Sequence, residues 1–379
     1  MQTVLVTGGA GFIGSHLVSA LLRQGHAVRV LDNLSPQVHG AVPQGLDWLA
    51  GEGIEFMRGS VTQREDLMRA LAGVSQVVHL AAETGTGQSM YQVARYNEVN
   101  SQGTALLFDV LANDRSLPVR QVVLASSRSV YGEGAYVCPA CADSVRRFPG
   151  SRGAQQLAAH RWEPLCPRCG AALAAVPTHE DDPVRPASIY AATKYAQEDL
   201  VRVGATSLGI GHAILRFQNV YGEGQSLQNP YTGILSIFST RVRRGIELPV
   251  FEDGQETRDF VHVEDVVRAI VACVSATTSP DTVINVGSGQ ATSVLDIASE
   301  LTRALGAEPR VRVTAEYRVG DIRHNVADIR RLSQLLHCAP QVSLPEGLRR
   351  FAAWVLTQPL PADLLGRAND ELRARRLMG

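Results

Sequence analysis

The stretch Val4-Leu5-Val6-Thr7-Gly8-Gly9-Ala10-Gly11-Phe12-Ile13-Gly14 decides the fold class, since a short apolar run leads directly into a glycine-rich turn. Residues 15–24 carry apolar side chains at helical spacing and precede Gly25, which predicts a helix. Strand, glycine turn and helix in this order form a dinucleotide fingerprint, because glycines permit a tight turn and a helix N-terminus attracts a pyrophosphate. A second strand is predicted over 28–31, and Asp32 at its end suits a ribose 2′-hydroxyl, which favours NAD over NADP.

Further apolar runs at 54–57, 77–80 and 122–125 predict more strands, and the pattern indicates an α/β protein with a doubly wound (Rossmann) parallel sheet. In such a sheet the residues just past the carboxyl end of each strand face the cofactor. We expect a long helix over 91–111, and a flexible loop over 85–89 on the substrate side. The predicted cofactor-binding residues are Gly8, Gly11, Phe12, Ile13, Gly14, Asp32, Asn33, Ser60, Val61, Leu80, Ala81, Ala82, Asn100, Tyr190 and Lys194.

The composition excludes several classes of protein. The chain has 379 residues, a formal net charge of −1 and 45% hydrophobic residues, so it can bury a sizeable core but has no basic excess for nucleic acid. No uncharged apolar run approaches the length of a membrane span, and the N-terminus lacks the basic segment of a signal peptide. We therefore expect a cytoplasmic protein with no membrane and no nucleic-acid partner.

A second motif lies in the middle of the chain, where Tyr190 and Lys194 are four residues apart. On a helix their side chains share one face, and a lysine charge beside a phenol favours the phenolate and lowers the pKa of the tyrosine. Such a tyrosine can act as a general acid or base near neutral pH. The same spacing is common on solvated helix faces, so its meaning depends on Ser126 and Ser127, which follow the strand predicted over 122–125.

Taken in chain order, these motifs resemble those of the extended short-chain dehydrogenases, in particular the NAD-dependent nucleotide-sugar epimerase/dehydratase branch. The resemblance covers residues 1–134 and about 180–340. It implies that Ser127 hydrogen-bonds a sugar oxygen, that Tyr190 moves its proton, and that Lys194 holds the nicotinamide ribose. A hydride would pass to NAD+ and return to the other face of the ketone, which inverts the stereocentre. The motifs that carry the resemblance are Gly-x-x-Gly-x-x-Gly from Gly8, Asp32, His79-Leu80-Ala81-Ala82, Asn100, Ser126-Ser127, Val130-Tyr131-Gly132 and Tyr190-x-x-x-Lys194.

The same resemblance suggests which residues bind the substrate, a nucleotide-diphosphate sugar. Arginine suits a diphosphate because its planar fork donates two parallel hydrogen bonds. Dehydratases of this branch carry acidic residues just before the Val-Tyr-Gly segment, whereas this chain has Arg128 and Ser129 there, which favours epimerisation over dehydration. Arg128 itself could equally be a surface cation. The predicted substrate-binding residues are Glu83, Thr84, Arg128, Asn219, Arg258 and Arg323.

Four of the six cysteines lie between Ser127 and Tyr190, in a separation of 63 positions that is far longer than the resemblance leads us to expect. Two Cys-x-x-Cys pairs, Cys138/Cys141 and Cys166/Cys169, have 24 residues between them, a spacing close to that of a structural four-cysteine zinc site. Idle thiols or a redox pair are the alternatives. Because the insertion ends just before the predicted catalytic helix, we expect a rigid lid that overhangs the mouth of the active site.

We therefore predict three regions and a dimer. Residues 1–220 form the NAD-binding domain, interrupted by a zinc-knuckle insertion over 135–180; residues 221–345 are mostly substrate-binding domain, and 346–379 form a helical tail. The resemblance implies a homodimer that pairs helices around 91–111 and 190–208. Within the family the chain looks most like enzymes that convert dTDP-L-rhamnose to dTDP-6-deoxy-L-talose through a 4-keto sugar. The alternatives are a UDP-glucose 4-epimerase, a nucleotide-sugar dehydratase and a non-catalytic NAD sensor.

Overall fold

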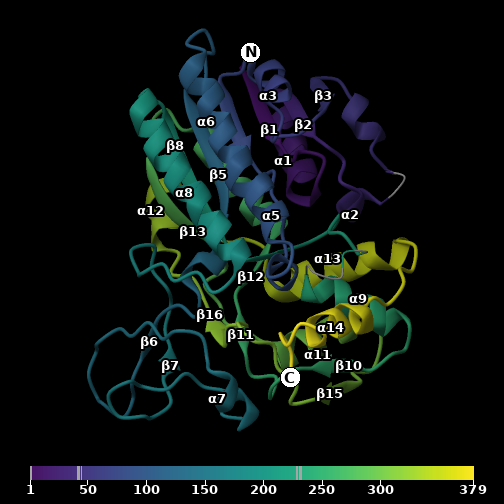
Figure 1. Ribbon diagram of the computed structural model, residues 1–379. Helices are drawn as coiled ribbons and strands as arrows, with labels where there is room; N and C mark the ends of the chain where they lie inside the picture. The colour runs from purple at the N-terminus through teal and green to yellow at the C-terminus, as the bar shows by residue number, and fades with distance from the viewer. Residues whose placement is uncertain (1, 41–42, 44, 228, 230–232) are drawn as a thin grey trace.

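The strand before the glycine turn lies inside a seven-stranded parallel sheet. The computed structural model describes residues 2–40, 43, 45–227, 229 and 233–379 (Figure 1). The strand order is β13-β8-β5-β4-β1-β2-β3, so the direction of winding reverses between β1 and β4, as in a doubly wound sheet. The strands are β1 (Thr3–Thr7), β2 (Ala27–Asp32), β3 (Ile54–Arg58), β4 (Gln76–His79), β5 (Gln121–Ser127), β8 (Gly211–Phe217) and β13 (Thr282–Val286).

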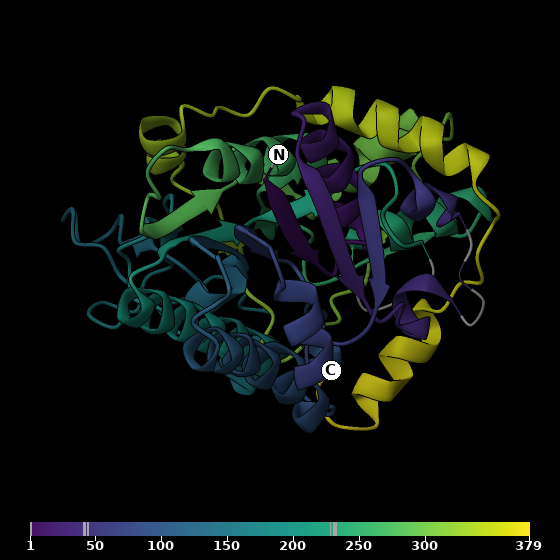
Figure 2. The same ribbon diagram turned by 90° about the horizontal axis from the view of Figure 1, so that it is seen from above.

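Both faces of this sheet are covered by helices, which explains why its strands are apolar throughout (Figure 2). Successive side chains of a strand point to opposite faces, so Val4 and Val6 pack into one hydrophobic core and Leu5 into the other. One face packs against α1 (Phe12–Arg23), α10 (Val263–Ser275) and α12 (Arg330–Leu336), and the other against α3 (Arg64–Leu71), α6 (Gly103–Asn113) and α8 (Ile189–Leu208).

The helix predicted over 91–111 is present, but its hydrogen-bonding pattern changes along its length. It consists of α5 (Val93–Tyr96), a π-helical segment η2 (Asn97–Gln102) and then α6. The flexible loop predicted over 85–89 is wrong, because residues Thr86–Ser89 form the short helix α4. The hydroxyl of Ser89 donates to the carbonyl of Thr86 and accepts from the backbone N–H of Tyr190, so this turn is fixed against the start of α8.

The C-terminal half builds a second, smaller hydrophobic core. The chain does not leave the sheet for good at residue 220, because α10 and β13 return to it from within the region predicted to bind substrate. The core includes Leu235, Phe238, Leu301 and Phe351. Besides α10, α12 and β13, the elements of this half are β9 (Asn219–Tyr221), α9 (Ile234–Arg243), β10 (Leu248–Val250), β11 (Thr257–Arg258), β12 (Phe260–His262), β14 (Thr292–Ser293), α11 (Val294–Ala304), β15 (Val311–Val313), β16 (His324–Asn325), α13 (Leu344–Thr357) and α14 (Leu365–Arg373).

The cysteine-containing insertion forms a small lobe of its own beside β11 and β16 (Figure 1). Two short antiparallel strands, β6 (Tyr136–Val137) and β7 (Ala174–Ala175), and one short helix, α7 (Ala154–Ala158), are its regular elements. Its core contains only Tyr136, Cys138, Cys166 and Leu173, with two partly buried residues packed against them. Such a core is too small to stabilise a lobe of this length alone. The remaining short helices of the described chain are α2 (Pro36–His39), η1 (Asp47–Ala50) and η3 (Arg128–Tyr131).

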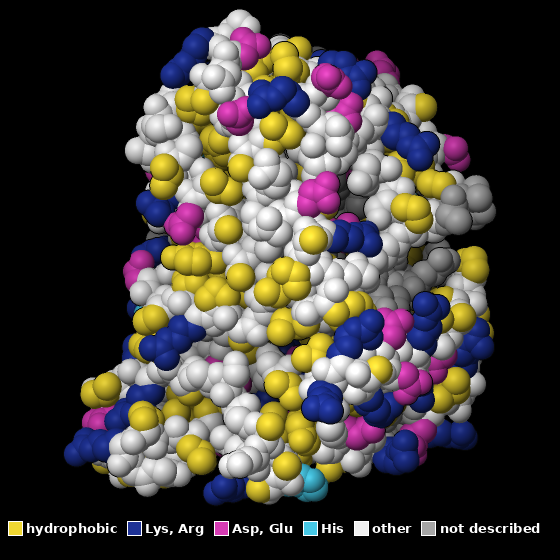
Figure 3. Space-filling view, viewed as in Figure 1, with side chains coloured by type: hydrophobic (Ala, Val, Ile, Leu, Met, Phe, Trp, Pro, Cys, Tyr) yellow, Lys and Arg dark blue, Asp and Glu magenta, His cyan; other side chains and the backbone are white. Residues whose placement is uncertain are grey.

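The surface shows no separation of charge on the face seen in Figure 3, where Lys and Arg side chains are interspersed with Asp and Glu. This distribution agrees with the net charge of −1. Among the helices that the structure describes, none combines the length and the apolar character that crossing a bilayer requires.

Candidate active site

A cavity of about 490 Å³ opens along the carboxyl ends of the sheet strands. The parallel register places Thr7 beside both Leu31 and His79, so the residues that follow β1, β2 and β4 meet at one edge. Every predicted cofactor-binding residue except Asn100 lines this cavity, which we call the cofactor cavity. The predicted cofactor-binding residues, apart from Asn100, therefore form one continuous wall of the cavity.

Two glycines of the motif occupy positions that no other residue could fill without displacing backbone. A Cβ on Gly8, whose φ is +68°, would lie 2.8 Å from the backbone nitrogen of Ala81. A Cβ on Gly14 would lie 2.5 Å from the Cα of Gly9. The turn can thus approach a ligand closely, and helix α1 starts against it at Gly11 without a side-chain cap. This arrangement fits the pyrophosphate of a dinucleotide.

Asp32 at the end of β2 is held by backbone N–H groups. Its Oδ2 accepts from Ala10 at 3.1 Å and its Oδ1 from Leu34 at 2.8 Å. The carboxylate is therefore fixed on the wall of the cofactor cavity, where its remaining lone pairs can accept from ribose hydroxyls.

The three predicted catalytic residues, Ser127, Tyr190 and Lys194, lie together on the wall of the same cavity. Ser127 ends β5, while Tyr190 and Lys194 share one face of α8, whose first turn is capped by the Ser188 hydroxyl. Burial raises the pKa of Tyr190, and the hydrogen bond with Ser127 and the charge of Arg128 oppose this rise. From the sequence we expected the charge of Lys194 to lower the pKa of Tyr190. In the structure the charge that lowers this pKa is that of Arg128.

Lys194 is buried, and its ammonium donates to Oε1 of Gln197 at 2.6 Å. Burial lowers the pKa of Lys194 to about 7, an effect that the charge of Glu198 opposes. Gln197 in turn donates to the hydroxyl of Thr104, which bonds to His79. The amine is therefore held at the end of a buried polar chain and is close to its titration point at neutral pH.

The sequence analysis missed a buried ion pair near the predicted catalytic residues. Glu198 pairs with Arg216 through contacts of 2.9 and 2.6 Å and also accepts from the hydroxyl of Ser126. The guanidinium of Arg216 lies 4.6 Å from the ring centroid of Tyr131. This cluster ties β5, α8 and β8 together, so it fixes the strand end that carries Ser127.

A second cavity, of about 260 Å³, meets the cofactor cavity at Arg128 and Asn219, which line both. Arg128 donates from Nε to Oδ1 of Asn219 at 2.7 Å. Burial lowers the pKa of Arg128 to about 9, and the neighbouring charge of Arg258 contributes. We call this space the substrate cavity. Its walls also include Met90, Ile234, Pro249, Phe251, Glu256, Val294, Arg318, Asp321, Leu365, Ala368, Leu372 and Leu377.

Three arginines on the walls of the substrate cavity, Arg128, Arg258 and Arg318, have only neutral hydrogen-bond acceptors among the described residues. Arg258 donates to the carbonyl oxygens of residues 257, 322 and 323, and Arg318 to Oδ1 of Asn369. Arg318 also lies over the ring of Phe251, 4.7 Å from its centroid. Glu256 and Asp321 line the same cavity, but neither forms a direct ion pair with these three arginines, so the lining keeps a positive excess that suits an anion.

Arg318 was missed by the sequence analysis, which selected Arg323 five residues later. The two differ in burial and partners: the Arg323 side chain is 2% exposed and lies among carboxylates, and it lines neither cavity. Arg323 is thus not placed to contact a substrate. Gly320, which lies between the two arginines, predicts a turn, and the residues at this turn line the substrate cavity. This glycine could have directed attention to Arg318.

Asn100 and the insertion also lie away from their predicted places. Asn100 is fully buried, accepts from the backbone N–H of Glu83 and donates to Thr193, so it supports the cavity wall from behind. Glu83 and Thr84, which we predicted to bind the substrate, line the cofactor cavity and not the substrate cavity, and Glu83 is paired with Arg95. None of the described residues of 135–180 lines either cavity, so the insertion is not the overhanging lid that we expected.

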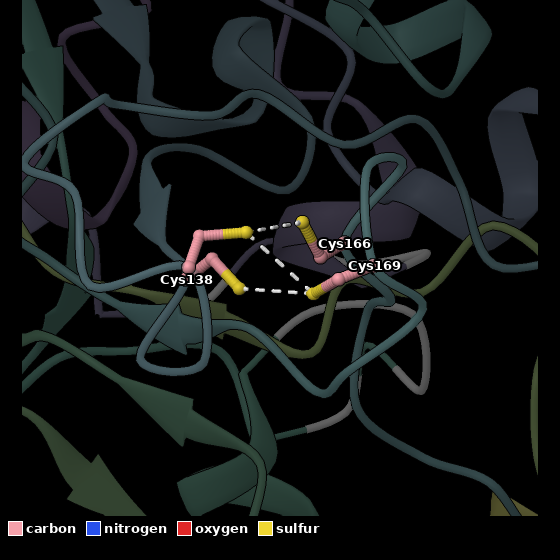
Figure 4. A group of neighbouring side chains, drawn as sticks. Cys138, Cys166 and Cys169 are labelled. Carbon is pink, nitrogen blue, oxygen red and sulfur yellow. Dashed lines mark hydrogen bonds between the residues drawn. The ribbon is translucent and has the colours of Figure 1, made fainter.

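The four cysteines of the insertion lie together, with all four Sγ atoms within 4.8 Å of one another (Figure 4). Three of the separations are 3.5 Å (Cys138 to Cys169), 3.8 Å (Cys141 to Cys166) and 3.6 Å (Cys141 to Cys169). Zn–S bonds of about 2.3 Å in a tetrahedron require Sγ atoms about 3.8 Å apart. These three separations are close to that value, so the four thiols lie where they could all contact one tetrahedrally coordinated ion.

Comparison with known proteins identifies the family of the chain. The model of the family described as "NAD dependent epimerase/dehydratase family" matches residues 4–149 and 169–287. Among curated relatives, the dTDP-L-rhamnose 4-epimerase of Burkholderia thailandensis is 39% identical over 358 residues, which cover 93% of this chain and 95% of that protein. The UDP-glucose 4-epimerase of Mycolicibacterium smegmatis is 32% identical over 355 residues, covering 91% and 96%.

Solved structures agree with this result. The UDP-glucuronic acid 4-epimerase of Bacillus cereus, in complex with UDP-glucuronic acid and NAD, has a TM-score of 0.75 at 26% identity and covers 94% of this chain and 99% of its own. The UDP-glucose 4-epimerase of Thermotoga maritima with UDP-glucose has a TM-score of 0.73 at 28% identity, covering 93% and 98%.

Proposed function

The chain belongs to the NAD-dependent epimerase/dehydratase family, and from this premise we propose that it is a nucleotide-sugar 4-epimerase acting on dTDP-L-rhamnose. The observation that carries the reaction class is the junction of the two cavities. There Ser127 and Tyr190 face the cofactor cavity, while Arg128 and Asn219 open into the substrate cavity. A sugar at this point would have its reacting carbon beside the cofactor and its diphosphate toward the arginines.

In this proposal Ser127 and Tyr190 hold the hydroxyl of the reacting sugar carbon. Tyr190 removes its proton as the carbon is oxidised and returns a proton when the carbon is reduced from the opposite face. NAD, when bound, supplies the hydride acceptor and donor for these two steps. Lys194 binds the nicotinamide ribose, and the buried Glu198–Arg216 pair keeps the end of β5 in place.

The position of Arg128 and Ser129 argues against dehydration. Elimination of water from a sugar needs an acid and a base at the reacting carbons. The two residues that follow Ser127 line the cofactor cavity and neither is a carboxylic acid. The ketone would therefore be reduced again rather than eliminate water, and inversion would be the net result.

The substrate cavity suits a nucleoside diphosphate. We assign the diphosphate to Arg128, Arg258 and Arg318, and the base to the apolar wall that includes Phe251, since that ring offers a flat stacking surface. The 39% identity to a dTDP-L-rhamnose 4-epimerase supports that sugar nucleotide and the product dTDP-6-deoxy-L-talose. UDP-glucose is the second candidate, because UDP-sugar epimerases share 32% identity with the chain.

Parallel assays with dTDP-L-rhamnose and UDP-galactose, followed by NMR of the sugar anomeric protons, test the proposal. We expect inversion at C4 of the rhamnosyl group and at least about tenfold lower kcat/KM for the UDP sugar. Turnover of the UDP sugar alone would replace the first substrate with the second. Turnover of neither, with NAD bound, would favour a non-catalytic NAD sensor.

We further propose that the four cysteines bind one structural zinc ion. All four ligand positions would be filled by Cys138, Cys141, Cys166 and Cys169, so the ion would stabilise the insertion and take no part in the reaction. Metal analysis of undenatured protein should find about one zinc per chain. Less than half an equivalent would leave idle thiols or a redox pair as the explanation.

A homodimer is the remaining part of the proposal. Val93 on α5 and Val203 on α8 are 47% and 57% exposed, on the helices that would pair. Sedimentation should give twice the mass of the chain, and Val203→Glu should shift the protein to monomer. A wild-type protein that sediments as a monomer would contradict this part alone.

A further inference from the structure

The insertion is joined to the substrate domain by buried ion pairs. Arg152, whose side chain is 1% exposed, donates from Nη1 to Oε2 of Glu252 at 2.7 Å and from Nη2 to the carbonyl oxygen of Asp321 at 3.0 Å. It also lies 3.4 Å from Glu133, at the start of the insertion. One side chain of the insertion thus contacts both a strand loop of the substrate domain and the segment that lines the substrate cavity.

Glu163 makes a second connection to the same segment. Its Oε1 accepts from Nε of Arg323 at 2.8 Å, and its Oε2 lies 3.0 Å from Nε2 of His324. Arg323 is held on its other side by Asp253, through contacts of 2.7 and 2.9 Å. The carboxylate of Glu163 therefore supplies one of the hydrogen-bond acceptors of the buried Arg323 guanidinium, near the end of the 317–324 segment.

The 317–324 segment is itself part of the substrate cavity. Arg318, Gly320 and Asp321 line the cavity, whereas residues 321, 323 and 324 contact the insertion. Trp162 of the insertion also lies 6.4 Å from the ring of Tyr317 at the start of the segment. The 321–324 end of the segment thus rests on the insertion through hydrogen bonds, whereas its 317–319 end is bonded through the backbone to residues 377–379 and contacts the insertion through Trp162.

The cysteine cluster lies next to Glu163 in the chain and so bears on where Glu163 can contact Arg323 and His324. Glu163 lies three residues before Cys166, and the carbonyl oxygen of Pro164 accepts from Leu173 in the small core around the cysteines. Because this core is too small to fold alone, an ion bound by the four thiolates would help to hold Glu163 in position. The family model matches residues up to 149 and again from 169, so Arg152, Trp162 and Glu163 come from a segment outside the match.

We propose that the metal-bound insertion positions the nucleotide-sugar site. Arg152 and Glu163 are positioning residues that hold the segment carrying Arg318. Metal occupancy therefore sets the affinity of the site for a nucleoside diphosphate. Buried charge pairs of this kind fix one geometry rather than adding much stability. The inference depends on the proposed function only in taking the substrate cavity as the nucleoside diphosphate site. Neither the insertion nor the 317–324 segment lines the described walls of the cofactor cavity, whereas the segment does line the substrate cavity, so NAD binding and the chemical step should be insensitive to the insertion.

The first test compares Glu163→Gln with the control Arg161→Gln in the zinc-loaded protein. The glutamine keeps the shape of Glu163 but removes its charge from Arg323 and His324, while Arg161 is an exposed residue two positions away. We expect the Kd for dTDP and UDP, measured by calorimetry with NAD present, to rise about tenfold for Glu163→Gln and to stay within twofold for the control. The KM for the sugar nucleotide should rise in parallel, with kcat and the Kd for NAD unchanged.

The second test removes the metal from the wild type with a chelator and restores it with zinc. We expect the same rise in the Kd for dTDP and UDP, reversed by zinc, and faster hydrogen exchange of residues 317–324 in the metal-free protein. In Glu163→Gln the metal should have a smaller further effect, because the two changes act through one contact.

Three results would overturn the inference: nucleotide affinity that is unchanged in both tests, a loss of kcat or NAD affinity without a change in KM, or a wild type that binds neither dTDP nor UDP. The proposed epimerase activity can be wrong while this inference holds. If dTDP or UDP binds and responds to the metal while no sugar nucleotide is turned over, the proposed activity is wrong and the coupling stands.

Discussion

The two cavities are built in different ways. The cofactor cavity is lined by residues that immediately follow β1, β2, β3 and β4, and its motif is continuous in sequence from Gly8 to Gly14. The substrate cavity collects α4, the start of α8, the loops around β10 and β11, residues 318–321 and the C-terminal helix α14. A parallel sheet brings consecutive strand ends to one edge, whereas the substrate cavity depends on segments that meet only when the whole chain is packed. Substitutions should therefore separate binding of the cofactor from binding of the sugar nucleotide.

The largest effect is expected at the junction of the cavities, with Tyr190→Phe. The ring and its packing against Tyr96 remain, but the hydroxyl that moves the proton is lost. We expect turnover to fall about a thousandfold, with NAD and dTDP binding within twofold of the wild type. Steady-state assays with calorimetry measure this. Retained turnover would show that Tyr190 is not the acid–base residue.

Gly14→Ala should affect the cofactor cavity alone. The added Cβ meets the backbone of Gly9 at 2.5 Å, so α1 must move away from the glycine turn. Overpacking of about 1–3 kcal/mol, if it all falls on the bound state, corresponds to NAD binding about 5- to 150-fold weaker. Fluorescence titration with NAD measures the change, and Gly366→Ala, where the added Cβ meets open space, is the matched control. Equal loss of dTDP affinity would break the distinction between the cavities.

Arg318→Met should affect the substrate cavity alone. The methionine keeps an apolar contact with Phe251 but removes a charged donor, so we expect the KM for the sugar nucleotide to rise about tenfold with kcat unchanged. Arg303→Met, at an exposed site on α11, is the control. A fall in kcat with constant KM would mean that Arg318 acts on the reaction instead of on binding.

The last effect leaves ligand binding aside and concerns the stability of the cofactor-free protein as pH rises. The pKa of Lys194 is about 7 in the folded protein and about 10.5 in the unfolded chain, so between these values the unfolded state binds more protons. The wild type should gain about 1.4 kcal/mol per pH unit relative to Lys194→Met across this window, most clearly between pH 7.5 and 9. Urea unfolding at several pH values measures this difference. A constant difference would show that Lys194 is fully charged in the fold.

The sequence predicted the framework of the site well because that part of the chemistry is local. The glycine spacing required a tight turn, Asp32 followed a strand, and the four-residue separation of Tyr190 and Lys194 placed both on one wall. The turn at 86–89 was mistaken for a loop because its stability comes from a distant contact, the bond between Ser89 and Tyr190. Asn100 was assigned to the cofactor because its motif position gave no information about burial.

The sequence by itself determined the doubly wound sheet, the cofactor wall and the cysteine cluster, since each follows from short spacings or from strand periodicity. Only the tertiary structure decided which arginine lines the substrate cavity. Arg318 and Arg323 are separated by five residues and are chemically identical, but Asp253 and Glu163 approach only Arg323. Whether an arginine is buried, and which carboxylate it pairs with, depends on segments up to 160 residues away in the sequence. The residues next to the arginine in the sequence cannot indicate such a contact.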